Sequence, residues 1–239
     1  MTSGPAPRAP RHSARATRSA GQRMRSALLD HASVLFRARG LSDVAVADIA
    51  AAADAFPSQV TYYFGTKEAL FVEAACRDLL HAARAAEEAA HAARDRHDYF
   101  RALVESVMQT DALGVFVEAM TLARRRGDLQ PLIARTVERL QDEGLRAYAG
   151  EMKARGWKSR QDPALVARRF WTVAIGVTIE GHATGRPAGL LIADMMALLE
   201  NPPSTGAAPV PLRAVTGGGE PDDQASDPAS SDPASKDQP

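Results

Sequence analysis

The sequence predicts an all-α protein, and three observations support that prediction. Between residues 21 and 200, apolar residues recur with the period of a helix, and no segment shows a convincing strand-like alternation. Glycine, proline and aspartate interrupt these segments at intervals suited to helix ends. At 239 residues and 45% hydrophobic content, the chain can bury one good core or two small ones. We therefore expect about nine helices in a two-part arrangement.

The N-terminal part is expected to begin with a helix over residues 21–39. Gly40 follows directly as its expected C-cap. Four residues at i, i+4, i+7 and i+8 place an apolar face toward the rest of the domain: Leu28, Ala32, Leu35 and Phe36.

Residues 44–71 predict a helix-turn-helix followed by the start of another helix. The first short helix has an apolar face, and the second places Val60 and Phe64 at i and i+4. If those two residues face the first helix, the opposite face of the second helix is free. That free face carries four uncharged hydrogen-bonding side chains suited to base edges or phosphates: Ser58, Gln59, Thr61 and Tyr62.

This region resembles TetR-type (TetR/AcrR) transcriptional regulators over about fifty residues. The resemblance is strongest at 62–71, YYFGTKEALF, preceded by 48–50, DIA. It extends upstream through Ala32, Leu35, Phe36, Arg39 and Gly40. It implies a three-helix DNA-binding domain followed by a helical domain that binds a ligand and dimerises. It also implies that Tyr62, Tyr63 and Lys67 hold the DNA backbone.

There are three departures from the family pattern, and they involve four positions. Asp54 replaces the usual turn glycine, and aspartate is among the few residues that tolerate a left-handed backbone. Ala45 replaces a threonine that commonly caps the second helix, so we expect that cap to fall to Ser42 or Asp43, if to anything. Phe56 and Pro57 replace a polar pair at the start of the recognition helix. Base reading is then expected to rest mainly on Ser58, Gln59 and Thr61.

Charge is segregated along a chain whose formal net charge is zero. Residues 1–68 carry nine basic and five acidic side chains, a local net charge of +4 that favours nucleic-acid binding. Composition predicts a disordered basic arm at 1–20, which could contact phosphates nonspecifically, enter a minor groove or be inert. We expect the helix-turn-helix domain at 21–66, an effector-binding and dimerisation domain at 67–200, and a disordered acidic tail at 201–239.

The effector domain is expected to open with a long helix capped by Thr66 and running to about Ala93. Further helices are predicted at 97–109, 112–126, 129–155, 162–184 and 188–200. In the resembled family this region encloses a small-molecule cavity. We expect its lining to include Phe116, Met120, Tyr148 and Trp171 and its effector to be uncharged or hydrophobic.

The last two helices are expected to form a homodimer interface, as they do in the resembled family. The eighth helix carries small residues that allow another helix to approach closely: Ala174, Gly176, Thr178, Gly181 and Ala183. The ninth carries a matching apolar stripe of Leu190, Leu191, Met195, Leu198 and Leu199.

Other classes of protein receive little support from the sequence. A lone Cys76 rules out an intrachain disulfide, no membrane span is predicted, and a cytoplasmic location is expected. Glu87, His91 and Asp95 have a spacing that could hold a metal, but their charged neighbours favour a solvated surface, so no metal or cofactor is expected. No nucleophile-base pair or phosphate loop suggests an enzyme.

The sequence thus favours a dimeric repressor of a near-palindromic double-stranded DNA operator, released by a small effector. The alternative keeps DNA binding but gives the C-terminal domain only a dimerising or protein-binding role.

Overall fold

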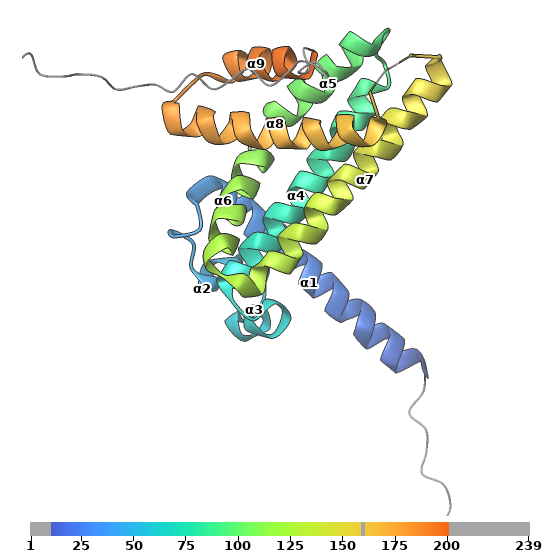
Figure 1. The fold of residues 1–239 in the computed structure, drawn as a ribbon. Coiled ribbons are helices and arrows are strands. Elements are labelled where there is room, and N and C mark those ends of the chain that lie inside the picture. Colours follow the sequence, from blue (N-terminus) through green and yellow to red (C-terminus); the bar gives the residue numbers. More distant parts are fainter. Residues whose placement is uncertain (1–10, 159–160, 201–239) are drawn as a thin grey trace, which may run out of the picture. The chain divides into compact units, whose positions relative to one another are not determined.

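The structure, a computed structural model, describes residues 11–158 and 161–200, with side chains described from Ser19 onward. Over these residues it contains nine α-helices, one 3-10 helix and no strand, which confirms the predicted fold class (Figure 1). In chain order the elements are α1 (Arg11–Arg39), α2 (Val46–Ala52), α3 (Pro57–Phe64), α4 (Lys67–Ala90), α5 (Arg96–Met108), α6 (Ala112–Arg125), η1 (Gly127–Leu129), α7 (Gln130–Arg155), α8 (Pro163–Thr184) and α9 (Ala188–Glu200).

The first helix begins earlier than predicted. It starts at Arg11 rather than near Gly21, so the prediction of a disordered arm is wrong for residues 11–20. After Pro10 this segment contains only residues that a helix accepts, including three alanines and three arginines with high helix propensity. Residues 1–10 and the predicted tail at 201–239 lie outside the described residues.

Turn chemistry places the helix ends close to the predicted positions. Asp54, between α2 and α3, has a φ of 50°, the left-handed conformation that the sequence predicted for it. Gly40 has a φ of 76° directly after α1. The Thr66 side chain accepts a hydrogen bond from the Ala69 amide at 3.1 Å and so caps α4.

The long helix α4 is the common element of the fold. Its first half packs against α1 and α3, and the helix also packs against α5, α6 and α7 (Figure 1). On the side of the DNA-binding helices, the Phe36 ring of α1 meets the Phe71 ring of α4 edge to face, with centroids 5.2 Å apart. The predicted domain boundary at 66–67 therefore falls at the start of a helix whose buried residues belong to one continuous core.

Helices α8 and α9 pack on each other across one end of α5 and α7 (Figure 1). The small residues of α8 are divided between two faces. Ala174, Thr178 and Gly181 are buried, and a Cβ atom at Gly181 would lie 2.4 Å from Leu191 Cδ1 of α9. Gly176 and Ala183 are exposed instead. Part of the predicted dimer face therefore packs within the chain.

No helix in the described part of the chain is long and apolar enough to span a membrane.

Candidate nucleic-acid interface and effector cavity

The recognition helix α3 has one buried and one exposed face. Val60 and Phe64 are buried, as their spacing predicted, and they fix α3 against the core of the domain. Three of the predicted DNA-contacting residues, Ser58, Thr61 and Tyr62, are exposed. Gln59 and Tyr63 are half-buried. The structure thus gathers the predicted base-reading side chains on one short helix, with hydrogen-bonding groups facing outward.

The two tyrosines differ in their surroundings. Tyr62 is 82% exposed, and its ring stands edge to face with that of Tyr63, at a centroid distance of 5.0 Å. Tyr63 leans on α1, because a Cβ atom at Gly21 would lie 3.4 Å from its hydroxyl oxygen. Tyr62 therefore presents its hydroxyl to solvent, whereas Tyr63 also supports the packing of α3 against α1.

The start of α3 is capped by a residue predicted to read bases. The Gln59 Oε1 atom accepts a hydrogen bond from the Phe56 amide at 2.9 Å. Pro57 occupies the first turn, where its missing N–H needs no partner. Gln59 therefore serves the helix with its oxygen and retains its NH2 group as a donor.

Lys67 has a structural role that the sequence did not indicate. Its Nζ atom donates to the carbonyl oxygens of Leu41 and Val44, each at 2.8 Å. These bonds fasten the segment between α1 and α2 to the first turn of α4. Most of the hydrogen-bonding capacity of the ammonium is therefore used within the protein, which leaves one N–H for any phosphate.

The cap of α2 differs from the predicted one. Ala45 is the N-cap residue, and the Asp48 carboxylate, three positions later, accepts from the Ala45 amide at 3.1 Å. Ser42 and Asp43, the predicted caps, do not serve this helix end. The Asp48 side chain therefore bonds the N-cap amide, whereas the first-turn amide that a threonine side chain at position 45 would bond receives no side-chain cap.

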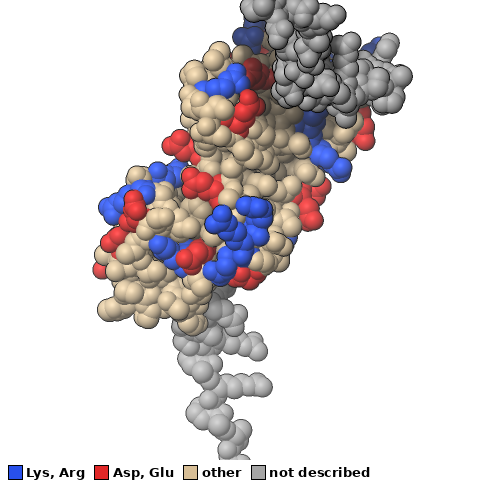
Figure 2. All heavy atoms as spheres, turned by 60° about the vertical axis from the view of Figure 1, so that its left-hand side comes forward, with Lys and Arg blue, Asp and Glu red and all other residues tan. Residues whose placement is uncertain are grey.

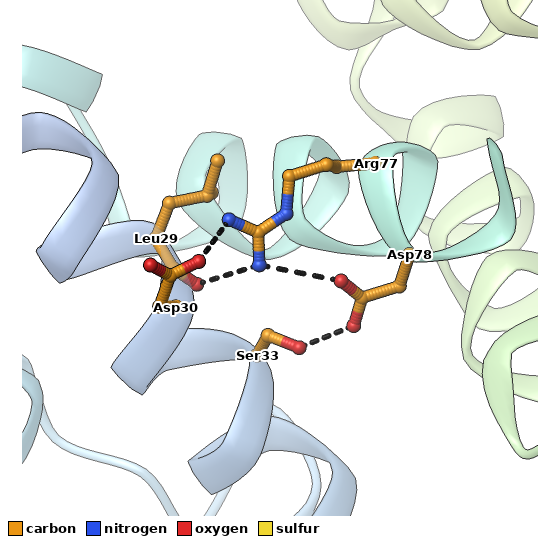
Figure 3. A network of polar contacts seen from close by, with 5 residues as sticks. All are labelled: Leu29, Asp30, Ser33, Arg77 and Asp78. Atoms are coloured by element: carbon orange, nitrogen blue, oxygen red, sulfur yellow. Dashed lines mark hydrogen bonds and ion pairs between the residues drawn. The ribbon is translucent and has the colours of Figure 1, made fainter. Parts of the chain in front are cut away.

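A polar network joins α1 to the middle of α4 (Figure 3). Arg77 of α4 donates to the Asp30 carboxylate at 2.5 Å and to the Leu29 carbonyl oxygen at 3.4 Å. Asp78 accepts from Arg77 at 3.3 Å and from the Ser33 hydroxyl. Helices α1 and α4 are therefore held together by directed bonds as well as by core packing.

Acidic and basic side chains alternate over the face seen in Figure 2 rather than forming a field of one sign. Several cations of the N-terminal part have partners. Arg25 pairs with Glu73 at 2.6 Å and lies over the Phe64 ring at 4.7 Å from its centroid, and Arg39 pairs with Asp48 at 3.6 Å. Part of the local positive charge therefore serves to hold α1, α2 and α4 together.

A partly open cavity of about 40 Å³ lies between α4, α5, α7 and α8. Two of the four residues predicted to line an effector cavity, Tyr148 and Trp171, lie in its wall. Phe116 and Met120 do not line it, because α6 directs Phe116 into the core, where it is fully buried, and packs Met120 against the same core. Aromatic rings cluster in the cavity wall: the Tyr148 ring centroid is 5.4 Å from that of Phe100 and 6.3 Å from that of Tyr99.

Tyr148, which lines the cavity, carries a buried polar atom. The Tyr148 hydroxyl is buried and makes no hydrogen bond within the described residues. Trp171, in contrast, donates from Nε1 to the Leu140 carbonyl oxygen at 3.1 Å. Buried polar atoms are nearly always paired, so this hydroxyl is an exception among the described residues.

Glu87 also lines the cavity and is half-buried, so the prediction of a solvated surface is wrong at this position. Burial, followed by the charge of Glu143, raises the pKa of Glu87 above its ordinary value. His91 pairs with Glu151 at 2.9 Å, and Asp95 caps α5. Among the residues the structure describes, no cluster of potential ligands could hold a metal ion.

The fold and the exposed recognition helix define a helix-turn-helix regulator with a helical C-terminal domain. Residues 28–74 match the family described as bacterial regulatory proteins of the tetR family, and residues 96–200 match the bacterial transcriptional repressor C-terminal family. A crystal structure of a candidate transcriptional regulator from Rhodococcus sp. RHA1 is 35% identical, covering 74% of this chain and 93% of that one, with a TM-score of 0.65. The chain belongs to the TetR family of bacterial transcriptional regulators.

Two more distant structures share the fold and were solved with small molecules. One, from Saccharomonospora viridis, is in complex with choline; it is 20% identical over 76% of this chain and 97% of that one, with a TM-score of 0.59. The other, RolR in complex with resorcinol, is 19% identical over 75% and 89%, with a TM-score of 0.55. The comparison with curated proteins gave no match.

Proposed function

We propose that this regulator is a dimeric repressor that binds a near-palindromic operator and is released by a small hydrophobic effector. The observation that carries the DNA-binding part is the exposed polar face of α3, held in place by buried Val60 and Phe64. In a dimer, two such helices would occupy successive major grooves, roughly 34 to 36 Å or a near multiple apart.

The exposed hydroxyl of Tyr62 is proposed to contact a phosphate. Replacing Tyr62 with Phe removes only that hydroxyl, and we expect weaker binding to operator and random DNA alike, by about 1 to 2 kcal/mol, with unchanged base preference. Binding titrations on an operator and its point variants measure both quantities. A Tyr62→Phe protein with altered sequence preference would contradict the assignment.

The proposed dimer interface is the outer surface of α8 and α9. Four large apolar side chains on these helices are at least half exposed in the single chain: Leu165, Ile179, Leu190 and Leu198. On α8, exposed Gly176 and Ala183 flank Ile179 and leave room for a second helix to approach. Apolar side chains exposed on two adjacent helices are typical of a surface that a partner covers.

The effector is proposed to enter the cavity between α4, α5, α7 and α8. Its walls are mainly aromatic and aliphatic, which favours a hydrophobic molecule, and the Tyr148 hydroxyl offers one hydrogen bond. At about 40 Å³ the cavity is smaller than the hundreds of cubic ångströms of an ordinary ligand site, so entry has to separate its walls. Because α4 forms one wall and carries Arg77 and Asp78, such movement would reach α1 and the recognition helix.

Ligand entry is testable through Trp171. We expect a hydrophobic effector to quench Trp171 fluorescence at the same concentrations that release the operator, since a ligand acts only by binding the released conformer more tightly. A Trp171→Phe variant retains Trp157 and identifies the source of the signal. Operator release without any change at Trp171 would count against this cavity.

Replacing Tyr148 with Phe should weaken effector binding without lowering the stability of the protein. The hydroxyl has no partner within the described residues, so its removal should leave the free energy of unfolding unchanged or increase it. Affinity for an effector that bonds the hydroxyl should fall about fivefold to tenfold, because one hydrogen bond is removed. Chemical denaturation and ligand titration measure the two effects. A marked loss of stability would show that the hydroxyl already has a partner.

The second candidate function is a ligand-independent regulator whose C-terminal domain only dimerises or binds protein partners. The small volume of the cavity between α4, α5, α7 and α8 favours this alternative, whereas a pocket of about 370 Å³ beside Thr178 and His182 does not. It predicts operator binding that no small molecule releases and a Trp171 signal that no small molecule changes.

A further inference from the structure

Phe56 is the one exposed phenylalanine among the described residues; the other six are buried. It is the N-cap residue of α3 and is 75% exposed. Its side chain is not part of the hydrophobic core, although transferring an aromatic ring from water to an apolar environment is favourable. Serine, threonine, asparagine and aspartate are the residues that stabilise an N-cap, so phenylalanine gives this helix end no side-chain cap.

The position of Phe56 suggests what covers it. The N-terminal residues of a recognition helix are the ones that contact base edges in the major groove. Ser58, two residues later, is exposed on the same end of α3. A ring at this place would meet the floor of the major groove, where the C5-methyl group of thymine is the apolar feature that distinguishes one base from the others.

The neighbouring Gln59 agrees with this assignment. Its Oε1 atom is bonded to the Phe56 amide, so the group it has left to present is the NH2 donor. This hydrogen bond also fixes the two residues relative to each other. Thymine offers an O4 acceptor beside its methyl group, which matches an amide donor next to an aromatic ring.

We propose that Phe56 determines operator specificity by packing on the C5-methyl group of a thymine in each half-site. The proposal rests on the proposed DNA-binding function. It gives a base-reading role to a residue whose type cannot hydrogen-bond to a base. It also explains how α3 compensates for the polar pair that it lacks at its start.

The test replaces single thymines of the operator with deoxyuridine, which removes the methyl group and leaves base pairing and O4 intact. The operator is obtained by selecting bound sequences from random DNA. For the native protein, we expect one thymine position in each half-site at which the change lowers affinity about threefold to fivefold, the effect of one buried methyl group. The other thymines should be insensitive.

Two variants assign the effect to Phe56. A Phe56→Ser protein should bind uracil and thymine equally at the sensitive position, while Ser favours the N-cap and keeps α3 folded. A Phe56→Leu protein should retain part of the discrimination because it keeps an apolar contact. A native protein indifferent to every methyl group, or a Phe56→Ser protein that still discriminates, would overturn the proposal.

The outcomes also separate this proposal from the function on which it rests. Specific operator binding without methyl sensitivity would remove the role of Phe56 and leave the DNA-binding function intact. Failure to enrich any sequence would remove the function itself. If Phe56→Ser instead changed the sedimentation of the protein without DNA, Phe56 would be a protein contact and the proposal would be wrong.

Discussion

Replacing Ile179 with Arg is expected to convert the protein to a monomer and to weaken operator binding by about 100-fold or more. Ile179 is 50% exposed at the centre of the proposed α8 and α9 interface. In a dimer its replacement would bury an unpaired cation, whereas a monomer could leave the side chain in water. A monomer holds one half-site and loses the gain from tethering two half-sites.

Sedimentation and operator titration measure the two effects, and circular dichroism should show an unchanged helical signal. A matched control is Ala154→Arg, which adds the same side chain at an exposed position of α7. Gly181 is unsuitable for this test because a side chain there would collide with Leu191 of the same chain. An Ile179→Arg protein that sediments as a dimer with normal operator affinity would exclude this surface.

Replacing Lys67 with Met should destabilise the unliganded protein by about 3 kcal/mol. The ammonium donates to two backbone carbonyl oxygens, and hydrogen bonds from charged groups contribute about 1.5 to 3 kcal/mol each. Methionine keeps most of the aliphatic stem but leaves the carbonyl oxygens of Leu41 and Val44 without that donor. Denaturant unfolding of the protein without DNA measures the loss, and exposed Lys153→Met provides the control.

The same variant distinguishes the structural role from the predicted phosphate contact. If Lys67 mainly binds DNA, its replacement should leave unfolding unchanged and reduce the slope of log affinity against log salt by about 0.9 for each phosphate that the ammonium no longer neutralises. Normal stability with a shallower salt slope would therefore refute the structural role.

The sequence predicted most of the fold because its signals are local. Helices begin or end at residues such as Gly40, Asp54 and Thr66, because the backbone or capping preferences of these residues act over one turn. Val60 and Phe64 indicated the buried face of α3 for the same reason. The early start of α1 was missed because helix propensity outweighed the lack of an apolar pattern over residues 11–20.

The features that the sequence missed depend on contacts between distant segments. Lys67 donates hydrogen bonds to backbone carbonyl groups 23 and 26 residues away. Because every residue has a backbone carbonyl group, the sequence does not show which ones accept. The cavity lining depends on how each helix is rotated about its axis. That rotation brought Glu87 to the cavity and placed Phe116 in the core. The spacing of apolar residues in the sequence is the same whether their side chains face the cavity or the core.

The most direct test of the central claim is the symmetry of the DNA that the native protein selects from a random pool. A dimer with one recognition helix in each of two successive major grooves predicts an inverted repeat, with half-site centres about 10 base pairs or a near multiple apart. The number of protein chains bound per duplex should be two or a multiple of two. Enriched sequences that lack two-fold symmetry, or no enrichment at all, would contradict a dimeric operator-binding regulator.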